Sequence, residues 1–146
     1  MVEDVSAAPP VGDPLVWLLR SAGVDRSSLI RVTGPSGLSA LMWLCRHGYQ
    51  QVGYLKSGRG CPHEAPDALV VAHTCGAAWL ARLLETGPHV REGGVLVFLS
   101  PLPEAQAADP IHRLLAAHGY DVERCVHGAR RELHVARRRP LLRRAA

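Results

Sequence analysis

A glycine-rich stretch is the first candidate for chemistry in this sequence. Gly34-Pro35-Ser36-Gly37 follows the apolar run 29–33 and comes just before a helical pattern. Glycine at such a turn lets a ligand approach the backbone closely, because no Cβ atom obstructs it, and Ser36 adds a hydroxyl. Glycine suits a tight turn without any ligand equally well. An ATP-binding P-loop is excluded, since Leu38-Ser39-Ala40 replaces its Gly-Lys-Ser/Thr ending.

His73 is the candidate for a catalytic group. It ends the apolar run 68–73 and is followed by Thr74 and Cys75. A histidine with an unperturbed pKa of about 6.5 can act as a general base near neutral pH. The alternative is a structural histidine that ends a buried strand and bonds to the neighbouring backbone.

Two mirrored segments raise the question of a zinc site. Cys61-Pro62-His63 and His73-Thr74-Cys75 hold four residues of types that bind zinc. His63, however, precedes the strand that His73 ends, and such a strand spans about 17–20 Å. We therefore expect no metal site. The remaining histidines fall near helix ends or in a hairpin and need no chemical role, and we interpret the four cysteines as reduced thiols.

These residues lie at the junctions of an alternating pattern. Strand-like runs occupy 29–33, 51–55, 68–73 and 95–99. The third and fourth are apolar almost throughout, as in strands buried on both faces of a parallel sheet. Helical patterns start near Pro14, Leu38, Ala77 and Asp109, and each ends at a glycine. This alternation indicates βαβ units, whereas the runs 120–127 and 130–136 predict a closing antiparallel hairpin.

In order and type, these segments resemble the class I S-adenosylmethionine-dependent methyltransferases. Residues 29–37 are similar to the family's first strand and glycine-rich loop, and 67–73 to the strand whose end faces the methyl group. Residues 90–98 resemble the family's Gly-Gly segment and apolar strand, and 119–138 its closing hairpin. The resemblance implies a Rossmann-like α/β fold, with a mostly parallel sheet that ends in a C-terminal antiparallel hairpin.

The resemblance also implies a cofactor site at the carboxyl ends of the parallel strands. S-adenosylmethionine would lie there, near the point where the strand order reverses. The residues that the resemblance assigns to cofactor binding are Gly34, Ser36, Gly37, Lys56, His73 and Thr74. His73 is the candidate for a base.

The chain departs from the family at two positions that bind the cofactor. The family has carboxylates at the ends of its first and second strands, and the second one holds the ribose hydroxyls. These positions fall on Arg31 and on Leu55–Lys56. Leucine accepts no hydrogen bond and lysine only donates, so binding is expected to be weakened.

The chain is also shortened. About ten residues, 57–66, replace a family strand and two helices. We therefore predict a six-stranded sheet that lacks one edge strand and leaves the strand 51–55 exposed. Pairing with a second copy would cover that edge, so we expect a homodimer.

The positive charge of the chain is concentrated near its C-terminal end. Residues 129–146 hold seven arginines and one glutamate and so carry a charge of +6. Because the whole chain has a net charge of +4, residues 1–128 together carry −2. We expect a lead-in at 1–12, one domain at 13–138 and a basic tail at 139–146.

Nucleic acid is not expected as a partner, because no basic helix with interleaved aromatic residues is present. Apolar runs of five residues and an acidic start predict a cytoplasmic protein without a membrane span.

Together these observations predict a methyltransferase-like protein with an eroded S-adenosylmethionine site. We expect a non-catalytic binding or regulatory module, which a protein partner would fit. The alternative is an active small methyltransferase that uses the stretch 34–37, Lys56 and His73. A metal-dependent function through Cys61 and Cys75 is the third hypothesis.

Overall fold

The computed structural model describes residues 14–55, 65–101, 109–127 and 131–140. Its strands are β1 (Leu29–Thr33), β2 (Gln51–Tyr54), β3 (Ala68–Thr74), β4 (Val95–Pro101), β5 (Tyr120–His127) and β6 (Arg131–Arg138). They form one six-stranded sheet in the order β2-β1-β3-β4-β6-β5. The first four strands are parallel, and β6 runs antiparallel to both β4 and β5. The expected fold class is confirmed, with β2 at an edge of the sheet.

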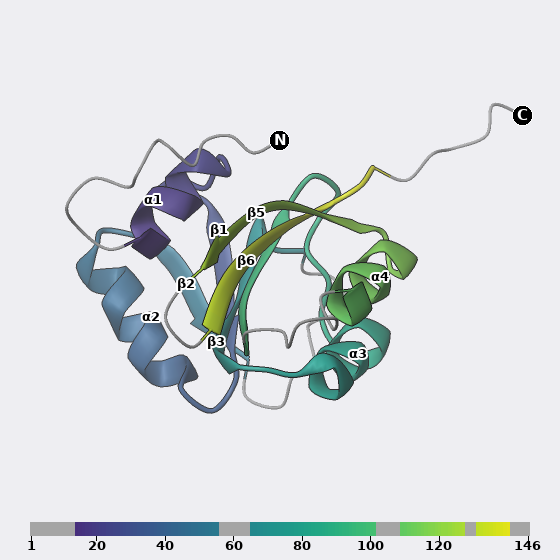
Figure 1. The fold of residues 1–146 in the computed structure, drawn as a ribbon. Coiled ribbons are helices and arrows are strands. Elements are labelled where there is room, and N and C mark those ends of the chain that lie inside the picture. Colours follow the sequence, from purple (N-terminus) through teal and green to yellow (C-terminus); the bar gives the residue numbers. More distant parts are fainter. Residues whose placement is uncertain (1–13, 56–64, 102–108, 128–130, 141–146) are drawn as a thin grey trace, which may run out of the picture.

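Four helices cover the two faces of this sheet. They are α1 (Pro14–Ser21), α2 (Gly37–Arg46), α3 (Ala77–Thr86) and α4 (Asp109–Ala117). In Figure 1, α1 and α2 lie on one face, and α3 and α4 lie on the other. The result is the three-layer arrangement that βαβ units produce.

Glycines end the helices by two different means. Gly23, Gly48 and Gly119 follow α1, α2 and α4 with φ values of +88°, +92° and +88°. This left-handed conformation is the usual glycine stop. Gly87, after α3, is extended with φ of −88° and is followed by Pro88. A residue before proline is biased away from the helical region, so Pro88 contributes to ending α3.

The two central strands are buried on both faces. Val70 and Val97 pack with α1 and α2, whereas Leu69 and Leu96 pack with α3 and α4. Full burial of such a side chain contributes about 1.5–3 kcal/mol, so these strands dominate the stability of the sheet. Their nearly continuous apolar sequence follows from having a helix layer on either side.

Arginines at the end of β6 and just after it hold the hairpin to the rest of the domain. Arg137 donates to the carbonyl oxygens of Gly93 (2.6 Å) and Ala22 (2.8 Å), and Arg138 donates to that of Val90 (2.6 Å). Arg139 donates to the carbonyl oxygen of Ala116 at the end of α4 (2.7 Å). These three cations therefore have structural partners. Residues 1–12 and 141–146 lie outside the described part of the chain.

The described helices are all too short or too polar to cross a membrane.

Candidate functional site

The turn after β1 and the end of β3 meet at one edge of the sheet. Gly34 has φ of +104°, in the left-handed region that favours glycine. A Cβ atom on Gly34 would lie 2.5 Å from Nδ1 of His73 and 3.2 Å from its Cε1. The imidazole therefore packs directly on the glycine backbone. Two of the candidate residues are in contact.

β3 is irregular in the stretch that contains His73. Val70 pairs with Val97 and Thr74 with Leu99, so four steps along β3 match two along β4. Bulges of this kind re-aim side chains and are common beside functional sites. On its other side, the ring of His73 meets Trp79 of α3 edge-on, with 4.5 Å between ring centroids.

The surroundings of His73 disfavour its protonated form. Loss of solvent around the ring lowers its pKa below the usual value of 6.5. Its Nδ1 atom is buried and has no hydrogen-bond partner within the described part of the chain. A neutral imidazole has one nitrogen that can accept a proton, so this side chain has the chemistry of a general base.

The second glycine of the turn packs on an aromatic ring. A Cβ atom on Gly37, the first residue of α2, would lie 2.6 Å from Cδ1 of Tyr54 and closer still to its Cε1. The Tyr54 hydroxyl donates to the carbonyl oxygen of Gly34 at 3.4 Å. The tyrosine at the end of β2 thus contacts both glycines of the turn, while Pro35 and Ser36 between them stay exposed. Tyr54 had no predicted role, because the sequence of a strand end does not show where an aromatic ring packs.

Arg31 and Leu55 occupy the two positions where the family resemblance places carboxylates. Arg31 of β1 lies beside Gly53 of β2 and donates to the carbonyl oxygen of Ile30 at 2.9 Å. The Leu55 side chain packs against the apolar cluster on the α3 side, and its backbone N–H donates to Val32 at 2.8 Å. Neither side chain can accept a hydrogen bond from a ribose hydroxyl.

The other predicted site residues divide into three groups. Ser36 and Thr74 are exposed, and the Ser36 hydroxyl makes no capping hydrogen bond to α2. Cys75 is buried and donates its S–H to the carbonyl oxygen of Leu99 at 3.5 Å, and burial raises its pKa to about 11. Lys56, Cys61 and His63 lie outside the described residues.

Comparison with known proteins identifies the fold. No protein-family model and no curated protein matches this sequence. A ribosomal protein L11 methylase from Lactobacillus delbrueckii subsp. bulgaricus matches with a TM-score of 0.59 and 14% identity, over 86% of this chain and 77% of that one. An O-methyltransferase family protein from Burkholderia thailandensis gives 0.61 and 14%, over 86% and 55%. This chain has the methyltransferase fold.

A third similar structure with the methyltransferase fold contains the cofactor. It is a candidate tRNA (m1A22) methyltransferase from Streptococcus pneumoniae, solved in complex with S-adenosyl-L-methionine. The match has a TM-score of 0.57 and 13% identity, over 91% of this chain and 76% of that one. Open α/β sheets bind ligands at the carboxyl ends of their strands, where the order reverses. In this sheet the reversal lies between β1 and β3, at Gly34 and His73.

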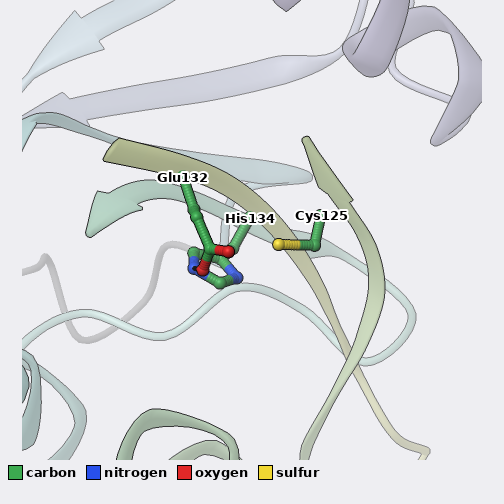
Figure 2. Close-up of side chains that lie close together, drawn as sticks. All are labelled: Cys125, Glu132 and His134. Atoms are coloured by element: carbon green, nitrogen blue, oxygen red, sulfur yellow. Dashed lines mark ion pairs between the residues drawn. The ribbon is translucent and has the colours of Figure 1, made fainter. Parts of the chain in front are cut away.

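A separate polar cluster lies on the sheet face that α4 covers, and sequence analysis missed it. His134 Nε2 lies 2.8 Å from Ser100 Oγ and 3.4 Å from Glu132 Oε1. Figure 2 shows Glu132 and His134 on β6 beside Cys125 on β5. All four are buried or half-buried. The available signal was Glu132 and His134 alternating with apolar residues, which places both on one face of a strand.

Proposed function

We propose that this chain is a methyltransferase-like binding or regulatory module that does not transfer methyl groups. The observation that supports this proposal is that two of the chain's own side chains pack on the two glycines of the turn. Tyr54 packs on Gly37, and His73 packs on Gly34. In a cofactor site those glycines would keep space for the ligand, whereas here the protein fills it.

The residues around the turn do not fit S-adenosylmethionine. By the family resemblance, acceptors for the cofactor would stand at Arg31 and near Leu55, and neither side chain accepts a hydrogen bond. Each buried group left unsatisfied costs about 1–3 kcal/mol, so two such losses weaken binding by about a hundredfold or more. We therefore derive no reaction step through this cofactor.

A thermal-shift series with S-adenosylmethionine and S-adenosylhomocysteine tests the proposal. A ligand at a hundred times its Kd stabilises a folded protein by about 2.7 kcal/mol, or about 5–10 °C in Tm for this size. We expect no shift at several millimolar of either compound. A clear shift at submillimolar ligand contradicts the proposal. An active methyltransferase in the same buffer serves as the control for ligand integrity.

The second candidate is an active small methyltransferase with His73 as its base. It is favoured by the lowered pKa of His73 and by its Nδ1 atom, which has no hydrogen-bond partner among the described residues. Release of S-adenosylhomocysteine on incubation with fractionated cell extract would support it. That release should fall in the His73→Gln variant and persist in His47→Gln, whose ring lies at the far end of α2.

A homodimer also belongs to this proposal. Within the described residues, no strand pairs with the outer side of β2, and α2 packs against this strand. Leu38 and Met42, one turn apart on α2, are 61% and 54% exposed. A second copy would cover both the strand edge and this apolar pair.

Light scattering tests the dimer at high protein concentration. We expect the mass of a dimer, and the mass of a monomer for the double variant Leu38→Glu/Met42→Glu. The control Arg46→Glu changes an exposed residue of the same helix and should stay dimeric. A monomeric wild-type chain counts against the proposal.

A further inference from the structure

The geometry points to a binding site for a zinc-type divalent metal ion, formed by Cys125, Glu132 and His134. The thiol sulfur, a carboxylate oxygen and an imidazole nitrogen of these residues all lie within 4.8 Å of one another. Figure 2 shows the three side chains converging from two neighbouring strands. They form the one such group of three or more His, Cys, Asp and Glu side chains in the described ranges.

Strand geometry brings the three ligands together. Glu132 and His134 are two residues apart on β6, so both point to the α4 side of the sheet. Cys125 of β5 pairs directly with His134. Directly paired residues share a face and lie about 4.5–5.5 Å apart at Cβ, which is within reach of a shared ion.

A bulge in β5 decides that Cys125 joins this group. Val122 pairs with Ala136 and Arg124 with Val135, so two steps on β5 match one on β6. Without this extra residue, Cys125 would pair with Leu133, whose side chain packs on the opposite face. The bulge therefore turns the thiol towards His134. Bulges that re-aim a side chain are common beside functional sites.

The surroundings hold the ligands in place. The ring of Phe98 stacks on His134, with 4.8 Å between centroids and 16° between planes. His112 of α4 meets the same ring edge-on at 6.0 Å. His134 and Glu132 are only 2% and 7% exposed. Packing of this kind fixes the orientation of a ligand and lowers the cost of binding.

The donor types select the ion. Sulfur, imidazole nitrogen and one carboxylate are zinc ligands, whereas magnesium and calcium require mostly oxygen. Ligands of tetrahedral zinc lie about 3.3–3.7 Å apart for bonds of about 2.0–2.3 Å, so shifts of about 1 Å close the site. Ser100 Oγ lies 2.8 Å from His134 Nε2, so its hydroxyl is close to the nitrogen that would bind the ion.

A serine-hydrolase triad does not fit the same residues. In a triad the serine and the carboxylate contact opposite nitrogens of the histidine. Here Ser100 and Glu132 both approach Nε2. Both groups lie beside Nε2, which is the nitrogen that would bind the metal ion.

Metal binding involves a defined proton exchange. Burial, followed by the charge and hydrogen bond of Glu132, raises the pKa of the Cys125 thiol to about 11. The metal-free thiol is thus protonated at neutral pH. On binding, the S–H bond breaks, a sulfur–metal bond forms, and the proton leaves to solvent.

Cobalt titration of the full chain, without a histidine tag, tests this site. We expect one Co²⁺ per chain, a thiolate-to-cobalt charge-transfer band in the near ultraviolet, and loss of that band when Zn²⁺ is added. Cys125→Ser should abolish the band. Glu132→Gln should keep the band but weaken affinity by at least tenfold, the lower bound for a supporting residue. Circular dichroism checks that each variant is folded.

Two matched variants complete the test. Cys75→Ser changes a buried thiol outside the proposed site and should leave the titration unchanged. Cys61→Ser removes the thiol of the alternative zinc site considered from sequence and should also leave it unchanged. The inference is overturned if the wild type gives no band at millimolar cobalt. It is also overturned if the band survives in Cys125→Ser, or disappears in Cys61→Ser or Cys75→Ser. Should Cys125→Ser not fold, unchanged affinity in Glu132→Gln would overturn it.

Discussion

The ring of Tyr54 at the end of β2 packs on Gly37 at the start of α2, with no room for a methyl group between them. This contact explains the last glycine of the turn without any ligand. The same glycine could instead serve a cofactor, and the two explanations differ in what a side chain at position 37 would disturb. In one case it disturbs Tyr54, and in the other it disturbs a ligand.

We expect Gly37→Ala to destabilise the protein by about 1–3 kcal/mol, because the new methyl group overpacks against the Tyr54 ring. In a Tyr54→Ala background the cost should vanish. Alanine in a helix is then favoured over glycine by about 0.5–1 kcal/mol. Urea unfolding of the four proteins gives the coupling. Equal costs in both backgrounds, within about 0.5 kcal/mol, would show that Tyr54 does not require the glycine.

Gly34→Ala should behave differently, because two causes act at that position. The positive φ costs about 1–3 kcal/mol for a residue with a Cβ, and the His73 ring adds a clash. Replacing His73 with alanine relieves the clash but not the backbone strain. We therefore expect partial rescue in the His73→Ala background, measured by the same unfolding method. Full rescue would contradict a role for φ.

The pH dependence of stability should report on His73. Its pKa in the folded protein is lowered by burial, whereas the unfolded value is about 6.5. The folded state then binds fewer protons. The contribution of His73 to the free energy of unfolding is present above about pH 6.5, and it is lost as the pH falls through the pKa of the folded state.

His89 shifts in the same direction, again mainly through burial. His73→Gln should therefore flatten the acid limb of the stability curve only in part. An NMR titration of the imidazole signals measures the two pKa values directly. A His73 pKa at or above 6.5 would contradict the buried, neutral ring.

Thiol reactivity should separate the described cysteines. Cys45 is exposed, whereas burial raises the pKa values of Cys75 and Cys125 to about 11. Because the thiolate is the reactive species, we expect an alkylating reagent at pH 7.5 to modify Cys45 first. The buried thiol of Cys75 should react only after urea unfolding, and the half-buried thiol of Cys125 should react more slowly than that of Cys45. Peptide mass spectrometry assigns each site, and early labelling of Cys75 would contradict its burial.

Local sequence patterns predicted most of the fold. The apolar runs at 68–73 and 95–99 became the central strands, because strands covered by helices on both faces need apolar residues at every position. Glycines marked the helix ends, because a residue without a Cβ adopts the left-handed conformation that ends a helix with little strain. The short connection after residue 55 correctly indicated a six-stranded sheet, with β2 at its edge.

The sequence by itself thus determined the order of elements, the layers and the missing edge strand, because these depend on periodicity and chain length. Tertiary structure decided what the chemical groups touch. Nothing in the residues 34–37 shows that Tyr54 contacts both glycines of the turn, since that ring belongs to another strand. Nothing in the hairpin sequence places Cys125 beside His134. A single extra residue in β5 shifts the pairing, and in a sheet a shift of one residue moves a side chain to the other face.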